Sequence, residues 1–358
     1  MKILVDIGHP AHVHYFRNFY QIMKGKGHKF LFIARRREVI EDLLKYYKID
    51  YISRGEGKDS AFGKLFYMLY ADFLILKHAL IFKPDIFISF SSPYAAQVAT
   101  FLNKPHIAIN DTEHTDKVHS KFTYPFSKSI ITPKSYQNDL GFKHVRIDNI
   151  IESFYLHPKY FKKDPSIFEF LKIDSNTPYV ILRFVSWNAF HDVGQGGISI
   201  EQKREIVKLV EQKFKVFISS ERELDQEFSK YQIKIPPEKM HDALAFASLF
   251  ISESGTMASE SALLGTPVIY VNSLPLMCYL KLEQEYGLLK HFKTDNGLLE
   301  YINNIISNQN LKEQTLASRD KMVKDFINPT DFLAWFIENY PQSKRIMKDN
   351  PDYQYNFK

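Results

Sequence analysis

The first 150 residues alternate short apolar runs with segments in which apolar residues recur at helical spacing. The runs that read as strands are Ile3–Ile7, Lys29–Ala34, Ile86–Phe90, His106–Ile109 and Ser129–Thr132. Helical spacing over Tyr15–Lys24 predicts a helix that ends at Gly25, and Glu38–Tyr47 predicts a second helix. Because strands that alternate with helices pair in parallel through right-handed crossovers, this half predicts an α/β domain with a parallel sheet.

The second half repeats the pattern after a Pro-containing stretch at 153–165, which we interpret as a linker. Its expected strands are Tyr179–Val185, Lys215–Ser219, Tyr231–Ile235, Leu249–Ser252 and Val268–Val271. Its expected helices are Ile200–Glu211, Glu238–Ala247 and Met257–Leu264. We therefore expect one domain over residues 1–155, a second over 166–330, and an aromatic C-terminal helical segment over 331–358.

Composition narrows the class of protein. A chain of 358 residues with 45% hydrophobic and 25% charged residues is typical of a soluble two-domain protein. It contains no uninterrupted run of about 18 apolar residues, so we expect no helix to span a bilayer. Cys278 is the single cysteine, which excludes an intrachain disulfide. With a strand directly at the N-terminus in place of a signal peptide, a cytoplasmic location is expected.

Charge is unevenly distributed along the chain. The net charge is +8 over residues 1–160 and −2 over 161–358. A basic first half suits an anionic lipid surface, a polyphosphate-linked acceptor or an ordinary solvated surface. Its lysines are scattered and carry no nucleic-acid motif, so we expect no nucleic-acid partner.

Segment Ala61–Phe82 is apolar and aromatic, and Lys64, Lys77 and His78 are interspersed among its apolar residues. An aromatic stripe at helical spacing usually belongs to a core helix that covers a sheet, and we favour that interpretation. The alternative is a helix that lies on a membrane surface, so that the protein is peripheral on the inner face of the membrane.

The most informative segment is Ile251–Tyr270. It predicts a buried strand, a turn of small residues (Ser254, Gly255 and Thr256), and a helix that Gly265 ends. The turn presents backbone N–H groups at a helix N-terminus, where an anion such as a diphosphate is favoured. Glu260 lies one turn further and could accept hydrogen bonds from a ribose diol. An ordinary strand–turn–helix connection with a solvated Glu is the alternative.

Polar residues follow three strands of the first half. Gly8, His9, His12 and His14 follow the first, Ser92 follows Ile86–Phe90, and Asp111, Glu113 and His114 follow His106–Ile109. Ligands of parallel sheets bind beyond the carboxyl ends of the strands, so we expect the three loops to converge on one crevice. A histidine there suits general-base chemistry near neutral pH.

His12 and His14 are alternate residues, so we expect only one of them to face the crevice. The histidine spacing is not that of a zinc signature, and we expect no metal. In the second half, Arg183 ends the first strand, where a guanidinium could clamp a pyrophosphate or form a surface ion pair. The Gly-containing loop that follows Arg183 is long enough to close over a ligand.

Five segments carry a family resemblance: Asp6-Ile-Gly-His-Pro-Ala-His-Val-His-Tyr-Phe16, Ser92-Pro-Tyr-Ala-Ala-Gln97, Asp111-Thr-Glu-His114, Tyr179-Val-Ile-Leu-Arg183 and Ile251–Tyr270. In these segments and their order, the chain resembles UDP-GlcNAc 2-epimerases and the peptidoglycan lipid-intermediate glycosyltransferase of the GT-B superfamily. It also resembles a prokaryotic GT-B-like family known only as a domain of unknown function. The resemblance covers roughly residues 1–330.

The resemblance implies a GT-B fold, in which two Rossmann-like domains with parallel sheets face a central cleft. The second domain would bind a nucleotide-sugar through Ser254, Gly255, Thr256, Glu260 and Arg183. The loops of the first domain, with Gly8, His9, Ser92 and Asp111, would receive a saccharide or lipid-linked acceptor. The last helix would return to the first domain.

Three functions are compatible with that fold. The first is a metal-independent, cofactor-free glycosyltransferase that takes a UDP-type donor in surface polysaccharide or glycolipid assembly, with His12, His14 or Glu113 as base. The second is a 2-epimerase or hydrolase, in which Glu113 and His114 take part in proton chemistry on the sugar. Where the epimerase loop continues Gly-Leu-Arg, Thr115-Asp116 follows here, which favours transfer. The third is a non-catalytic nucleotide-sugar-binding protein.

Overall fold

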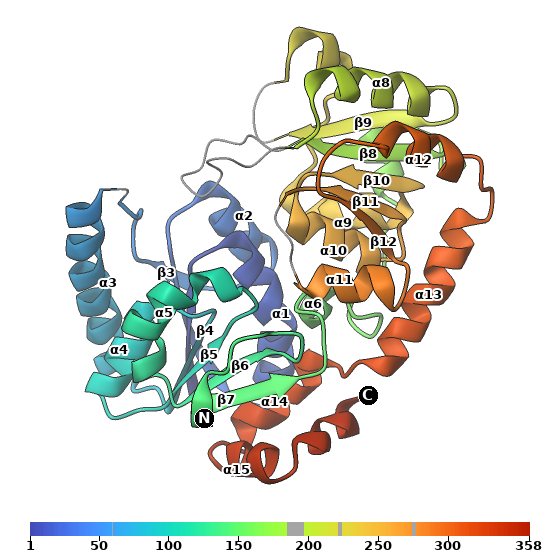
Figure 1. Ribbon diagram of the computed structural model, residues 1–358. Coiled ribbons are helices and arrows are strands. Elements are labelled where there is room, and N and C mark those ends of the chain that lie inside the picture. Colours follow the sequence, from blue (N-terminus) through green and yellow to red (C-terminus); the bar gives the residue numbers. More distant parts are fainter. Residues whose placement is uncertain (59, 185–196, 221–223, 274–276) are drawn as a thin grey trace. The chain divides into compact units, whose positions relative to one another are not determined.

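The computed structural model describes residues 1–58, 60–184, 197–220, 224–273 and 277–358 (Figure 1). The chain forms two compact units. The first comprises Met1–Tyr155 together with Phe326–Lys358, and the second comprises Leu156–Asp325. The C-terminal segment thus belongs to the first unit, and its helix α14 (Pro329–Glu338) packs against α1 (Pro10–Gly25).

The first unit is built on a seven-stranded sheet of order β3-β2-β1-β4-β5-β6-β7, in which every pairing is parallel. Its strands are β1 (Lys2–Ile7), β2 (Lys29–Ala34), β3 (Tyr51–Ser53), β4 (Ile86–Ser89), β5 (His106–Ile109), β6 (Ser129–Pro133) and β7 (His144–Ile147). The five predicted strands are present, and β3 and β7 are additional. The strand order reverses between β1 and β4, the point at which ligands of doubly wound sheets bind.

Helix α1 begins at Pro10, five residues before the predicted start at Tyr15. His9 caps it by accepting a hydrogen bond from the Ala11 N–H, and Pro10 occupies the first turn, where its missing N–H costs nothing. The early start places His12 inside the first turn of the helix. The remaining helices of this unit are α2 (Glu38–Tyr46), α3 (Ala61–Phe82), α4 (Pro93–Phe101), α5 (Asp116–Phe122), α6 (Ser153–Leu156, whose last residue belongs to the second unit) and α15 (Gln342–Asp349).

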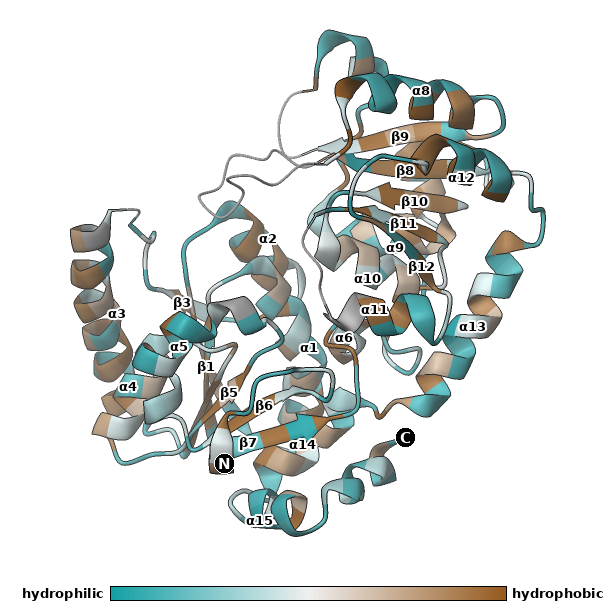
Figure 2. Ribbon diagram, in the orientation of Figure 1, coloured by the Kyte–Doolittle hydropathy of each residue, from teal (hydrophilic) through white to brown (hydrophobic). Residues whose placement is uncertain are grey.

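Helix α3 corrects the interpretation of Ala61–Phe82 as a core helix. One side, with Ala71, Ile75 and Ala79, is buried and packs with residues of β1, β2 and α4. The opposite side is exposed, with Phe62 at 79% and Phe73 at 68% exposure. Most of the α3 ribbon has the colour of hydrophobic residues (Figure 2). By length and composition alone, Phe62–Phe82 is also apolar enough to cross a membrane, although we expected no such helix from the sequence.

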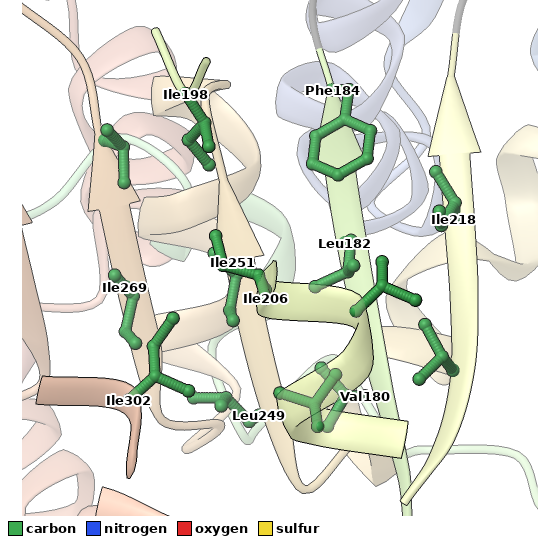
Figure 3. Close-up of a cluster of buried hydrophobic side chains, with 14 of the residues drawn as sticks. Val180, Leu182, Phe184, Ile198, Ile206, Ile218, Leu249, Ile251, Ile269 and Ile302 are labelled. Atoms are coloured by element: carbon green, nitrogen blue, oxygen red, sulfur yellow. The ribbon is translucent and has the colours of Figure 1, made fainter. Parts of the chain in front are cut away.

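The second unit contains a five-stranded parallel sheet of order β12-β11-β10-β8-β9. Its strands are β8 (Tyr179–Phe184), β9 (Lys215–Ser220), β10 (Leu249–Ser252), β11 (Val268–Val271) and β12 (Leu289–Phe292). Alternate residues of these strands, such as Val180, Leu182 and Ile251, form a buried cluster under helix α8 (Ile200–Glu211) (Figure 3). The expected strand at Tyr231–Ile235 is wrong, because only an isolated bridge joins Gln232 to Ile218.

The helices of the second unit are α7 (Ile167–Leu171), α8, α9 (Met240–Phe246), α10 (Gly255–Leu263), α11 (Met277–Gln284), α12 (Leu298–Ile305) and α13 (Leu311–Asp325). Gly265 ends α10 as predicted, with a φ of +76° in the left-handed region. A Cβ there would lie 2.5 Å from Leu316 Cδ2, so both backbone conformation and space require glycine.

Candidate active site

The first unit contains a cavity of about 550 Å³ at the carboxyl edge of its sheet. Residues that follow β1, β2, β3 and β4 line it, together with side chains of α3 and α5. Of the predicted site residues, Gly8, His9, His12 and Ser92 are in this lining. The cavity therefore lies at the point where the strand order reverses, and residues of the first and second predicted loops meet in it.

Two helix N-termini border the cavity. Gly8 and His9 precede α1, and Ser92 caps α4 by accepting a hydrogen bond from the Ala95 N–H. Ser91, just before that cap, has a φ of +51°, and its hydroxyl donates to the carbonyl of Ile109 (3.0 Å). A non-glycine residue at positive φ stores strain, which proteins retain mostly at functional sites. Both helix N-termini favour an anionic ligand.

A buried ion pair forms part of the cavity wall. Arg54, directly after β3, donates from Nε to Asp6 Oδ1 (2.8 Å), and both side chains are almost fully buried. Arg54 also donates to the hydroxyl of Tyr67, and its guanidinium lies 4.8 Å from the ring centroid of Tyr94. Asp6 Oδ2 has no hydrogen-bond partner among the described residues. The sequence analysis missed Arg54 entirely.

Further cations line the same cavity: Arg35 after β2, Lys58, and Lys64 on α3. Gly57 permits the close approach of Arg35, since a Cβ on Gly57 would lie 2.3 Å from Arg35 Nη2. With Arg54, these side chains give the cavity a cationic lining. In the sequence, Arg35 and Arg54 each follow a strand directly, and this position could have indicated a role at the sheet edge. β3 was too short to be recognised as a strand, so Arg54 was not identified.

His12 is held neutral. Burial lowers the pKa of His12 well below its ordinary value, and the neighbouring His9 and Arg54 lower it further. The N–H of Gly8 donates to His12 Nδ1 (3.3 Å), which assigns the ring proton of the neutral form to Nε2. The ring packs against Phe90, with centroids 4.8 Å apart. In this tautomer Nε2 of His12 carries the ring hydrogen and is a hydrogen-bond donor.

His14 does not belong to the cavity lining. It is buried on another face of α1, where its ring stacks on Tyr155 and lies 3.3 Å from the guanidinium of Arg17. The expectation that only one of His12 and His14 faces the crevice is met, and His12 is that residue. His14 has a packing role.

The third predicted loop does not line the cavity, which corrects the expected convergence of three loops. Asp111 accepts a hydrogen bond from the hydroxyl of Thr112 (2.6 Å), and Glu113 Oε1 accepts from the N–H of Gln137 (3.3 Å). The side chain of His114 lies outside the part of the chain that the structure describes. Glu113 is therefore directed toward the segment after β6.

A buried hydrogen-bond network fixes the region around this loop. Asn110 Nδ2 donates to the hydroxyls of Tyr124 (2.8 Å) and Tyr136 (3.1 Å), and both tyrosines donate to Asp116. Burial raises the pKa of both tyrosines well above the ordinary value, with Asp116 as a further cause. Both hydroxyls therefore stay protonated and keep donating, and the polar residues of this region are used for structure.

The second unit has a polar sheet edge of its own. Arg183, at the end of β8, is aligned with Ser252 of β10 on one side and Ser219 of β9 on the other. Its Nη1 donates to Ser219 Oγ (2.9 Å). The loop that follows Arg183, expected to close over a ligand, lies outside the described residues.

The Ser254–Thr256 turn forms the N-terminus of α10. The Ser254 N–H donates to Ser252 Oγ (2.8 Å), and the first helical hydrogen bond runs from the Ala258 N–H to the Ser254 carbonyl (3.1 Å). The backbone N–H groups of Gly255, Thr256 and Met257 come before that first helical bond. The side chain of Ser254 does not cap them. The geometry is that of a helix N-terminus open to an anion.

Glu260 is buried, one turn into α10. Its Oε1 lies 3.1 Å from Nε2 of His241 on α9. The predicted ribose-binding carboxylate is thus oriented by a histidine that the sequence analysis did not single out. A buried Glu–His pair holds the carboxylate in a fixed position, in which it can accept hydrogen bonds. The same pair also joins helix α9 to helix α10.

Neighbouring polar groups complete this edge. The carboxylate of Glu253, also buried, accepts from the Ile198 N–H (2.7 Å) and pairs with Lys203 (3.5 Å). Asn272, after β11, donates to the Glu253 carbonyl (3.1 Å). Within the described residues, no group of three or more His, Cys, Asp or Glu side chains is arranged to hold a metal ion.

Comparison with known proteins places the chain in a family. A family model described as a protein of unknown function, DUF354, matches residues 1–338. The chain belongs to the DUF354 family. An uncharacterized protein of Methanocaldococcus jannaschii is 25% identical over 353 residues, which cover 95% of this chain and 98% of the relative.

Solved structures share the fold. A UDP-GlcNAc 2-epimerase from Neisseria meningitidis, solved with bound UDP-GlcNAc, matches with a TM-score of 0.62 at 14% identity, covering 98% of this chain and 99% of that one. The glycosyltransferase SsfS6 of Streptomyces sp. SF2575 matches with a TM-score of 0.60 at 14% identity, covering 95% and 100%. The DUF354 chain therefore has the predicted GT-B-type fold, with a Rossmann-like parallel sheet in each unit.

Proposed function

We propose that this DUF354 protein is a metal-independent glycosyltransferase that uses a nucleotide-diphosphate sugar, of UDP type, in surface polysaccharide or glycolipid assembly. The observation that supports the proposal is that each of the two units has a polar site of its own. The second unit offers a helix N-terminus beside an arginine, and the first offers a separate cation-lined cavity. A transferase needs two such sites, whereas an epimerase needs one.

The donor side rests on Ser254–Thr256, Arg183 and Glu260. The amides at the start of α10 would hold the diphosphate, and Arg183 would stabilise the negative charge that develops as the nucleotide leaves. The carboxylate of Glu260, oriented by His241, would accept hydrogen bonds from the ribose hydroxyls. With these charges in place, no divalent ion is required to stabilise the leaving group.

The acceptor side rests on the cavity of the first unit. Since His12 donates from Nε2 in its neutral tautomer, we assign it to positioning the acceptor. The carboxylate of Asp6, fully buried behind Arg54, would hold that guanidinium in position to meet the acceptor. Gly8, His9 and Ser92 would hold polar parts of the acceptor at the two helix N-termini.

Donor binding tests the first half of this proposal. Calorimetry with UDP, GDP, CMP, TDP and their sugar conjugates, with and without magnesium, should give a signal for one nucleotide that magnesium does not change. Glu260→Ala should weaken that binding at least tenfold, which corresponds to the loss of about 1.4 kcal/mol. Glu227→Ala, an exposed carboxylate of the same unit, is the matched control. Unchanged affinity in Glu260→Ala would remove Glu260 from the site.

Epimerisation is the second candidate, because the fold is also that of UDP-GlcNAc 2-epimerases. Incubation of UDP-GlcNAc with the protein, without any acceptor, separates the two reactions. A new sugar nucleotide would identify an epimerase and overturn the transferase. Turnover that depends on an added acceptor would support the transferase.

A further inference from the structure

The most unusual surface of the molecule is the outer face of α3. Its exposed apolar side chains form one stripe, in which they recur every three or four residues up to Phe73 and again after the exposed Lys77: Phe62, Leu65, Phe66, Leu69, Tyr70, Phe73, Leu80 and Ile81. At 1.5 Å per residue this stripe extends for about 30 Å. Soluble proteins rarely expose an apolar surface of that length, and such surfaces mark contact with a partner or a membrane.

The stripe, which we call the α3 face, extends onto α5. Leu65 and Met68 of α3 line the same cavity as Val118 and Phe122 of α5, and Val118 and Phe122 are themselves exposed. Gln97 of α4 donates to the carbonyl of Phe122 (3.0 Å) and ties α5 to the unit. The apolar wall of the cavity is thus continuous with the α3 face, whereas Arg35 and Arg54 bring positive charge to the cavity from the ends of β2 and β3.

Exposed lysines flank the α3 face: Lys58, Lys64, Lys77, Lys83, Lys117 and Lys121. In the same segments the acidic residues are Asp59, Asp72 and Asp116, so the surface is net positive. Long lysine side chains can lie along an apolar surface while their ammonium groups reach the headgroups of anionic lipids. The combination is that of a helix that lies in a membrane interface.

Two observations decide against other occupants. A twofold contact between copies of this chain would bring two net-positive faces together, which opposes self-association. A membrane-spanning α3 would have to leave its unit, but Ala71, Ile75 and Ala79 are buried in the unit. The Tyr67 hydroxyl also accepts from Arg54 and donates to the Gly55 carbonyl (3.3 Å).

We propose that the α3 face docks on an anionic lipid bilayer, so that an amphiphilic acceptor anchored in that bilayer reaches the cavity. The phosphate-bearing head of such an acceptor would meet Arg35, Arg54 and the two helix N-termini, and its apolar chain would lie along Leu65, Met68 and Phe122. The part concerning the acceptor rests on the proposed transferase function. Docking on the bilayer does not.

Sedimentation of the full-length protein with vesicles tests the docking. The protein should bind vesicles of phosphatidylcholine mixed with phosphatidylglycerol, bind pure phosphatidylcholine more weakly, and lose affinity as salt rises. Phe66→Ser and Phe73→Ser should each weaken binding about tenfold or more, from the lost burial of one aromatic side chain. Lys77→Glu should weaken it several-fold.

Phe142→Ser is the matched control, because Phe142 is a comparably exposed phenylalanine of the same unit outside the α3 face. Melting temperatures establish that each variant is folded. Absence of vesicle binding, or binding that these substitutions leave unchanged, would overturn the proposal. A dimer in sedimentation equilibrium that Phe73→Ser dissociates would assign the face to a second copy instead. Because no donor is present, failure here leaves the donor-binding test intact.

Discussion

The buried pair of Asp6 and Arg54 provides the sharpest test of how the cavity is held together. Arg54 contacts Asp6, Tyr67 and Tyr94 at once, and Asp6 has no exposed side-chain surface. Arg54→Met keeps the bulk of the aliphatic stem but leaves the carboxylate of Asp6 without its partner. Breaking a buried pair in this way costs about 3–5 kcal/mol, because a charge remains that neither water nor a counter-ion stabilises.

The matched control is Arg204→Met in the second unit. Arg204 donates to Glu227 through two bonds of 2.8 and 2.9 Å, so its bond geometry equals or exceeds that of the Arg54 pair. Both partners are about two-fifths exposed, and exposed pairs contribute about 0–1 kcal/mol. The two variants therefore remove the same residue type and differ in the burial of the pair.

Urea unfolding and differential scanning calorimetry measure the difference. For a unit of this size, Arg54→Met should lower the melting temperature of the first unit by about 6–20 °C, and Arg204→Met should lower that of the second by less than about 4 °C. The double variant Asp6→Asn, Arg54→Met should recover part of the loss, because both charges are gone. If Arg54→Met lowers stability no more than Arg204→Met does, burial does not account for the contribution of the Asp6–Arg54 pair to stability.

Three further predictions concern single side chains. His12→Gln should lower kcat/KM for transfer by about 100-fold, because the acceptor loses a positioning contact, whereas His14→Gln should change the melting temperature and leave kcat/KM within a few-fold; equal loss of activity in both would refute the assignment of His12. Burial lowers the pKa of His106, between Ser89 and Ser127, to about 3. In the unfolded chain this histidine has a pKa of about 6.5, so it becomes protonated there at a higher pH than in the folded unit. The first unit should therefore lose up to about 1.4 kcal/mol of stability per pH unit as pH falls from about 6.5 towards 3. His106→Gln should remove that contribution, as unfolding at several pH values would reveal. Burial, with Lys163 and Arg319 nearby, lowers the pKa of Lys312 to about 7, so the second unit should gain stability as pH rises from about 7 to 10. Lys312→Met should abolish this gain in stability at high pH. It should also lower the free energy of unfolding by about 1–3 kcal/mol, because the carbonyls of Ala245 and Ala247 lose their hydrogen-bond donor. Lys208→Met, which removes an exposed lysine, is the control.

The strands that could be predicted are those with enough consecutive apolar residues to show a pattern. Strands such as Lys2–Ile7 and Leu249–Ser252 are buried along most of their length and read directly from the sequence. β3 has three residues, which cannot display a period, and Lys290 and His291 interrupt the apolar run of β12. The start of α1 was misplaced because apolar spacing was given more weight than the cap formed by His9 and Pro10.

The candidate site could be predicted where it depends on one strand and the turn after it. The position of His12 and the geometry of Ser254–Gly255 follow from local sequence, and the structure has both at sheet edges. The Asp6–Arg54 pair joins residues 48 positions apart, one on β1 and one directly after β3, and β2 separates these two strands in the sheet. That contact requires the strand order, and no local pattern contains it. The direction of Glu113 likewise depends on the Gln137 backbone, 24 residues away.

Helix α3 illustrates a limit of a different kind. A helix that is apolar on every side has the same sequence pattern whether it is enclosed by protein or exposed to lipid, so periodicity could not decide between the two interpretations. The decision comes from the rest of the unit, which buries the side of α3 that carries Ala71, Ile75 and Ala79 and leaves the opposite side exposed. Tyr67 lies on that packed side, where its hydroxyl contacts Arg54 at the cavity. Helix α3, which presents the apolar face, is therefore attached through Tyr67 to Arg54, the cation that a phosphate would meet. This contact explains why an exposed apolar surface and a buried ion pair occur in the same small region of the fold.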